Sequence, residues 1–212
     1  MIYHNILVLI ELNLYLSFVL IMEKPEDFID VYEFTQLYGS LKENPARVIF
    51  DQVVKICIRL QNFGIFHRDI KDENILLNVN TLEAKLIDFG CAIEATTDDT
   101  FLSFSGTPEF AAPEVRQKRG YQADSSTSWT LGVLLYVLLF GDTPFTGVSE
   151  AEVGLREKVR PKFEFSMLNL VKYDESILTP EAKDLLNRLL DPEPLTRMAL
   201  QQIHSSPWMQ KA

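Results

Sequence analysis

The sequence of 212 residues has few cysteines and an excess of negative charge. Its two cysteines, Cys57 and Cys91, lie far apart, so the chain offers neither a disulfide framework nor a metal-binding cysteine spacing, and we expect a reducing compartment. Lysine and arginine number 20 against 30 acidic residues, a net charge of −10. General nucleic-acid binding needs a basic face, so we expect no nucleic-acid partner. An acidic surface remains compatible with basic peptides.

The amino-terminal segment also lacks an uninterrupted apolar run long enough to span a bilayer. Residues 6–22 are rich in leucine, isoleucine and valine, but Glu11 and Asn13 interrupt them and no basic segment precedes them. We therefore predict two buried strands, residues 6–10 and 15–22, joined by a turn near Asn13, and no membrane partner.

Helical patterns dominate the rest of the chain. Asn44, as N-cap, and Pro45 predict a helix start, and Gly64 predicts its end. Residues 129–140 are apolar on nearly all sides, which indicates a helix at the centre of a helical domain. Thr179 and the following proline predict a further helix that ends near residues 191–192. The first helix presents one apolar face, made of Ile49, Val53, Ile56 and Leu60.

Three short motifs indicate the chemistry of the chain. His-Arg-Asp-Ile-Lys-Asp-Glu-Asn occupies residues 67–74, Asp-Phe-Gly residues 88–90 and Ala-Pro-Glu residues 112–114. In this order they are the signatures of a protein-kinase catalytic loop, magnesium loop and activation-segment end. Residues 75–77 and 85–87 are predicted to form a strand pair between the first two motifs. Each motif alone is a weak signal, and the ordered set is a specific one.

The residue types fit phosphoryl transfer, which depends on positioning and charge neutralisation. Asp69 is predicted to accept the proton of the substrate hydroxyl, and Lys71 to reach the transferring phosphate of ATP. Asn74 and Asp88 offer the hard oxygen ligands that Mg²⁺ prefers. Lysine two residues after the aspartate is typical of serine/threonine kinases, and Thr107 is expected to hydrogen-bond Asp69 and Lys71.

Two further predictions concern the surroundings of these motifs. Glu114 and Arg197 are expected to form a buried ion pair that braces the activation segment. Cys91, directly after the magnesium loop, is expected to be a small buried hydrophobic residue, and the alternative is a reactive thiol near the nucleotide.

Five segments of the chain together match the pattern of one kinase family: residues 18–26, 67–76, 85–90, 141–145 and 207–210. On these segments the chain resembles the Pim family of serine/threonine kinases, in the calmodulin-dependent-kinase-like group, from about His4 to Gln210. Pro25 in the hinge removes a backbone N–H that usually binds adenine. Thr127 stands where most kinases have an aspartate, and Pim kinases also lack that aspartate. PAS-domain kinases share the catalytic motif and are the nearest competitor, but the hinge proline favours Pim.

The resemblance implies an α+β, protein-kinase-like fold. We expect mainly the helical C-lobe, residues 30–212, with a two-strand N-lobe remnant in residues 1–22 and a hinge in residues 23–29. Several nucleotide contacts are implied as well: Met22 as gatekeeper, Glu23 as first hinge residue, Pro25 in the hinge, and Leu76 as the floor under adenine.

By the same resemblance, Glu73 reads arginine upstream of the target serine or threonine, helped by Asp30 and by Glu33 one helical turn beyond it. Carboxylates bind guanidinium groups bidentately, so the expected partners are basic, arginine-rich protein substrates. The alternative is that these acids are ordinary surface charges. A monomer in the cytoplasm, with the nucleus as a second location, is expected.

A kinase ATP site also needs a glycine-rich loop, a strand lysine and a helix glutamate. No Gly-x-Gly-x-x-Gly pattern and no Val-Ala-Ile-Lys equivalent occur in the 212 residues. We therefore expect an N-terminally truncated copy of a kinase that is inactive without the missing N-lobe. The alternative is a non-catalytic, kinase-like C-lobe that acts as a protein-interaction module.

Overall fold

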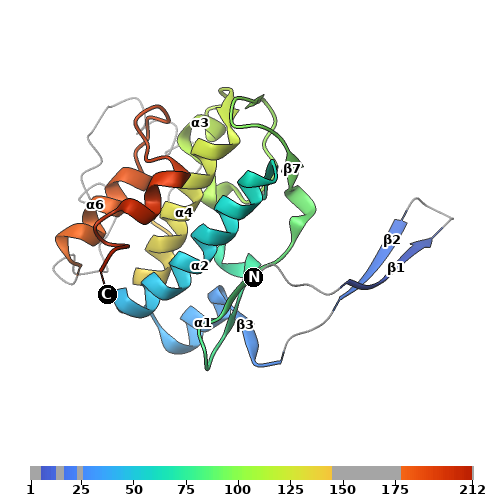
Figure 1. The fold of residues 1–212 in the computed structure, drawn as a ribbon, viewed down its shortest axis with the longest axis horizontal. Coiled ribbons are helices and arrows are strands. Elements are labelled where there is room, and N and C mark those ends of the chain that lie inside the picture. Colours follow the sequence, from blue (N-terminus) through green and yellow to red (C-terminus); the bar gives the residue numbers. More distant parts are fainter. Residues whose placement is uncertain (1–5, 13–16, 23–25, 145–177, 212) are drawn as a thin grey trace.

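A computed structural model describes residues 6–12, 17–22, 26–144 and 178–211 of the chain, and side chains from residue 26 onward (Figure 1). The expected turn near Asn13 and the hinge residues Glu23 and Pro25 lie outside the described residues.

Two antiparallel strands form a hairpin at the amino-terminal end. β1 (Ile6–Leu12) pairs with β2 (Ser17–Met22), so that Leu12 lies opposite Ser17 and Ile6 opposite Met22. The predicted strand pair is confirmed, but β1 extends past Glu11 because that residue continues the ladder opposite Phe18. Figure 1 shows the hairpin standing apart from the helical body.

A small antiparallel sheet covers one side of the helical body. β3 (Phe28–Asp30), β5 (Ile75–Asn78) and β6 (Ala84–Leu86) follow the order β3-β5-β6. The predicted pair is β5 with β6, where β6 lies one residue earlier than expected, and β3 adds an edge that the sequence pattern did not reveal. Alternate residues of β5 and β6 face the core, as the two-residue period of a strand requires.

Three helices build the core. α2 (Glu43–Asn62), α4 (Ala123–Phe140) and α6 (Pro180–Leu189) pack together, with α4 in contact with both of the others. α4 is long and apolar enough to cross a membrane, but 78% of it is buried inside the protein, as in the central helix of a globular core. Gly132 allows the close approach of α6, because a Cβ there would lie 2.8 Å from Leu190 Cδ2.

The helix starts depart from the prediction in one place. Lys42 is the N-cap of α2 with extended backbone angles (φ −67°, ψ 159°), and Asn44 and Pro45 lie inside the first turn. Proline is tolerated there because first-turn N–H groups have no partner within the helix. At α6 the prediction is confirmed, since the hydroxyl of Thr179 accepts a hydrogen bond from the N–H of Ala182 at 3.3 Å.

Short elements carry the segments around the motifs. α1 (Val31–Tyr38) follows β3, and 3₁₀ turns lie at Asp72–Asn74, Phe89–Cys91, Pro108–Phe110 and Leu200–Ser205. The remaining elements form two ladders and one helix: β4 (Ile65–Phe66) with β7 (Ile93–Glu94), β8 (Thr100–Phe101) with β9 (Tyr121–Gln122), and α3 (Pro113–Arg116). The described residues thus have the α+β architecture, mainly helical with small sheets, that the sequence predicts.

Candidate active site

Asp69 is the centre of a hydrogen-bonded group of side chains. Thr107 Oγ1 donates to Asp69 Oδ1 at 2.7 Å, and Asn74 Nδ2 donates to Asp69 Oδ2 at 3.1 Å. The same amide also donates to the backbone carbonyl of Asp69 at 2.8 Å. Because the amide nitrogen of Asn74 is occupied in this way, its Oδ1 is the atom left to act as a ligand. The predicted contact between Thr107 and Asp69 is confirmed.

Lys71 lies on the other side of Asp69. Its Nζ is 3.8 Å from Asp69 Oδ2 and 2.7 Å from Glu73 Oε2, so the ammonium group lies between two carboxylates. Burial alone would lower the pKa of Lys71, but the hydrogen bond that Lys71 donates to Glu73 and the negative charges nearby outweigh burial and raise the pKa above its ordinary value. Lys71 is therefore cationic. The expected hydrogen bond between Lys71 and Thr107 is not found among the described residues, and Lys71 pairs with Glu73 instead.

His67 connects the catalytic loop to the magnesium loop. The backbone N–H of Asp69 donates to His67 Nδ1 at 3.3 Å, and His67 Nε2 lies 3.0 Å from the carbonyl oxygen of Ile87. Since Nδ1 accepts, Nε2 carries the proton and donates, which is the pattern of a neutral imidazole. Burial lowers the pKa of His67, in agreement with a neutral ring. The ring also packs edge-on against Phe89, with centroids 4.8 Å apart.

The magnesium loop begins in an unusual backbone conformation. Asp88 has φ 60° and ψ 77°, a left-handed region that is rare outside glycine, and its carboxylate accepts a hydrogen bond from the N–H of Gly90 at 3.1 Å. Such conformations are frequent where function fixes the backbone. Asp88 is exposed, and the N–H of Ile87 just before it donates to the carbonyl of Asn74 at 2.9 Å. The two predicted magnesium ligands are thus held on adjoining backbone segments.

The loop between the second and third motifs is fixed by close packing. Gly106, with φ 142°, precedes Thr107, and a Cβ at this position would lie 2.5 Å from the carbonyl oxygen of Arg68. Arg68 itself has φ 63°, and its Nε donates to the carbonyl of Cys91 at 2.7 Å. The absence of a side chain at Gly106 is therefore what allows Thr107 to reach Asp69.

Cys91 is not the buried hydrophobic residue that the sequence predicted. It is half-buried, and the hydroxyl of Ser105 donates to its Sγ at 3.2 Å. The difference arises because the activation segment passes close to Cys91 and supplies this polar neighbour. Cys57 is the fully buried thiol, and burial raises its pKa to about 12.

The buried ion pair between Glu114 and Arg197 is confirmed. Arg197 Nη1 and Nη2 donate to the two carboxylate oxygens at 2.7 and 2.8 Å, the bidentate geometry that suits guanidinium and carboxylate. The guanidinium also donates to the carbonyls of Ser125 at 2.9 Å and Asp191 at 2.8 Å, and it lies 5.1 Å from the ring centroid of Trp129. The pair ties α3 to the N-terminal part of α4 and to the loop after α6.

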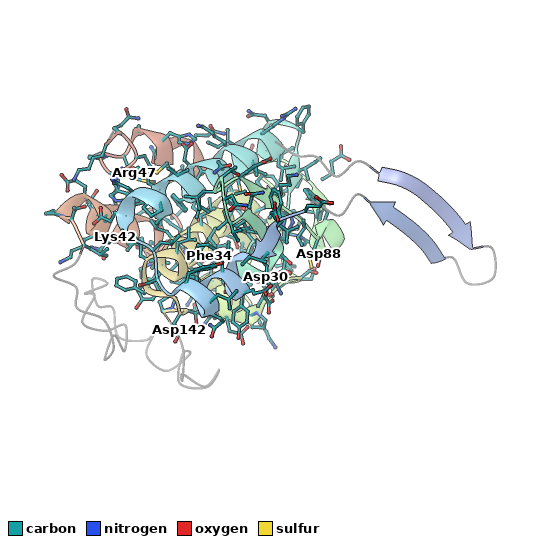
Figure 2. All side chains as sticks on the ribbon, turned by 90° about the horizontal axis from the view of Figure 1, so that it is seen from below. Asp30, Phe34, Lys42, Arg47, Asp88 and Asp142 are labelled. Atoms are coloured by element: carbon teal, nitrogen blue, oxygen red, sulfur yellow. The ribbon has the colours of Figure 1, made fainter. Side chains whose placement is uncertain are left out.

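The acidic residues predicted to bind substrate are only partly free. Asp30 Oδ1 caps α1 by accepting from the N–H of Glu33 at 2.7 Å, while Glu33 itself is exposed. Glu73 pairs with Lys71, but its side chain is 56% exposed. Figure 2 shows Asp30 and Asp88 on the part of the helical body nearer the hairpin, away from Lys42 and Arg47.

Asp72 is a member of this acidic group that the sequence reasoning missed. It is 8% exposed, and burial, together with the negative charges of Glu73 and Asp30, raises its pKa. A signal was available, because Asp72 directly precedes Glu73 in the motif. Its burial depends on the packing of the Asp72–Asn74 turn against α1, which no local pattern predicts.

The predicted nucleotide contacts fall at the edge of the described structure. Leu76 lies in the middle of β5, opposite Asp30 on one side and Lys85 on the other, and it is half-buried. Met22 ends β2 in backbone register with Ile6. Lys85 Nζ lies 4.5 Å from the ring centroid of Phe28, on the strand beyond β5.

Comparison with known proteins identifies the family to which this arrangement belongs. The model of the protein kinase domain matches residues 4–209, and the chain belongs to this family. It is 39% identical to CBL-interacting serine/threonine-protein kinase 20 of Arabidopsis thaliana, over 82% of this chain and 38% of that protein. It is 35% identical to a PAS domain-containing serine/threonine-protein kinase of Mus musculus, over 91% of this chain and 13% of that protein.

A third relative is the serine/threonine-protein kinase pim-2 of Danio rerio, 33% identical over 92% of this chain and 58% of that protein. The relatives are thus serine/threonine kinases of several kinds, and the identities do not single out the Pim family. The chain spans between 13% and 58% of the length of these curated relatives.

Proposed function

We propose that the catalytic loop supports serine/threonine kinase chemistry, in which the γ-phosphate of ATP passes to a hydroxyl of a protein substrate. The observation that supports this most strongly is the environment of Asp69. Its carboxylate is held by Thr107 and Asn74 and lies close to the cationic Lys71. A carboxylate fixed in this way can accept a hydroxyl proton and orient that oxygen, while Lys71 supplies positive charge for a phosphate.

The residues present fit a magnesium ion that is shared with nucleotide phosphates. Asn74 Oδ1 and the exposed carboxylate of Asp88 offer oxygen atoms, and Mg²⁺ is commonly bound by one or two protein oxygens plus phosphates and water. In the part of the chain that the structure describes, no group of three or more His, Cys, Asp or Glu side chains forms a self-contained metal site. When bound, ATP and Mg²⁺ would supply the phosphoryl group and neutralise its charge, with Met22, Glu23, Pro25 and Leu76 as the proposed nucleotide contacts.

Basic substrates belong to the same proposal. Asp30 retains one carboxylate oxygen beyond its capping bond, and Glu33 and Glu73 are exposed. Burial raises the pKa of Asp72, and the negative charges of Glu73 and Asp30 raise it further. A bound arginine would offset this local excess of negative charge. We also propose a Pim-like assignment, a monomeric state, and a cytoplasmic and nuclear location. The Pim-like assignment rests on the catalytic motif and on Pro25.

A second candidate function is a non-catalytic interaction module. It is favoured by one observation, the lack of a glycine-rich loop or strand-lysine motif among the 212 residues. We propose that this chain alone transfers little or no phosphate, and that adding the amino-terminal lobe of a related kinase confers transfer.

The experiment compares the chain with a fusion that carries such a lobe, using radiolabelled ATP, Mg²⁺ and an arginine-rich serine peptide. We expect transfer by the fusion, and a loss of at least about 10³-fold in Asp69→Asn. A folded but inactive fusion would favour the interaction module. Strong Asp69-dependent transfer by the chain alone would contradict the proposal that this chain alone transfers little or no phosphate.

A further inference from the structure

The last residue of α3 and the loop that follows it are basic in an otherwise acidic protein. Residues 115–123 contain Arg116, Lys118 and Arg119 and no acidic residue, within a chain of net charge −10. Lys118 and Arg119 are exposed, and no ion pair involving either is found among the described residues. We call residues 116–119 the basic loop.

The basic loop is attached to the activation segment at its start. Arg116 Nη2 donates to the carbonyl of Glu109 and Arg116 Nε to that of Ala111, both at 3.0 Å. These carbonyls lie just beyond Thr107, whose hydroxyl binds Asp69. Arg116 therefore fixes the position of the basic loop relative to the segment that leads away from the catalytic aspartate.

The rest of the loop is fixed as well. The N–H groups of Lys118 and Arg119 donate to the carbonyls of Val115 and Glu114, both at 3.0 Å. Gly120 then passes so close to the activation segment that a Cβ there would lie 2.7 Å from Thr100 Cγ2. The β8–β9 ladder follows directly. The two exposed cations thus stand on a backbone that is hydrogen-bonded in place, which reduces the entropy lost when they bind a ligand.

The elements that carry the acidic and the basic groups lie at opposite ends of the helical body. Figure 1 shows β3 and α1, which carry Asp30 and Glu33, at one end of the helical body and α3 at the other. Asp69 is linked to the first side through Lys71 and Glu73, and to the second through Thr107. A peptide whose hydroxyl reached Asp69 would therefore have carboxylates on one side and the basic loop on the other.

We propose that the basic loop binds acidic residues downstream of the target serine or threonine, so that preferred substrates are basic upstream and acidic downstream. The inference rests on the proposed function, which assigns upstream arginine to Asp30 and Glu73. An extended peptide that continues past Asp69 then runs toward the opposite side, where Lys118 and Arg119 offer the complementary charge.

The test measures peptide binding to the 212-residue chain by fluorescence anisotropy at low ionic strength. One peptide has arginines upstream of a serine and aspartates two to four residues downstream. A second replaces the downstream aspartates by asparagine, and a third replaces the upstream arginines by asparagine. The variant Lys118→Glu/Arg119→Glu is compared with Lys42→Glu/Lys183→Glu, which makes the same change in net charge at α2 and α6.

We expect the downstream aspartates to tighten binding about two- to tenfold, as a few exposed charge pairs allow, and added salt to weaken the gain. The gain should vanish or reverse in Lys118→Glu/Arg119→Glu and persist in the control variant. If upstream arginine matters and downstream aspartate does not, the inference is wrong and the proposed substrate site stands. If neither charge matters, both are wrong. Because the peptide comparison is made on the unaltered chain, a misfolded variant does not prevent the test.

Discussion

The ion pair between Glu114 and Arg197 gives the sharpest prediction for stability. Both side chains are almost fully buried, and removing one partner of a buried pair typically costs about 3–5 kcal/mol because a charge is left unpaired. In Glu114→Ala the guanidinium of Arg197 keeps its hydrogen bonds to the carbonyls of Ser125 and Asp191, so we expect the free energy of unfolding to fall by about 3 kcal/mol. In Arg197→Ala the carboxylate of Glu114 and both backbone carbonyls lose their donor, so we expect the free energy of unfolding to fall by about 4–5 kcal/mol.

Urea unfolding followed by circular dichroism and tryptophan fluorescence measures these losses. The double variant should lose less than the sum of the single losses, since the second substitution removes the charge that the first left unpaired. Asp184→Ala is the control, because its exposed ion pair with Arg188 should contribute less than about 1 kcal/mol. A loss below about 1 kcal/mol in Glu114→Ala, or additive losses in the double variant, would refute this reasoning.

Three other substitutions test separate parts of the structure. Gly132→Ala should destabilise by about 1–3 kcal/mol in urea unfolding, because its Cβ would collide with Leu190. Asp72→Asn should raise the melting temperature at pH 7, since the raised pKa disfavours the ionised form in the fold, and the gain should shrink toward pH 4. Glu43→Gln should cost about 1–3 kcal/mol at pH 7 but less in acid. Burial raises the pKa of Glu43, but the hydrogen bonds from Thr179 and Trp208 outweigh burial and lower the pKa below its ordinary value, so the carboxylate stabilises the fold only while it is ionised.

Long, strongly patterned elements could be predicted from the sequence. The apolar face of α2, the all-round apolar surface of α4 and the Thr179 cap of α6 each reflect a local pattern that the fold preserves. The contacts around Asp69 were predictable in type because the motifs fix which residues occur together, and Thr107 reaches Asp69 as expected.

What could not be predicted depends on residues distant in the chain. The N-cap of α2 moves to Lys42, and Glu43 in the first turn is held by Thr179 at 2.6 Å and by Trp208 at 2.8 Å, far along the sequence. Two-residue ladders such as β8–β9 have no period to detect. The polar neighbour of Cys91 comes from the returning activation segment.

The measurement that tests the central claim most directly is a kinetic double-mutant cycle on Asp69 and Thr107, made in the fusion with an amino-terminal kinase lobe. We infer that these two side chains act as one unit through their 2.7 Å hydrogen bond. Thr107→Val should therefore lower kcat by about tenfold or more in the Asp69 background and have almost no further effect in Asp69→Asn. Independent losses that multiply in the double variant, or a fusion whose transfer survives Asp69→Asn, would contradict the account.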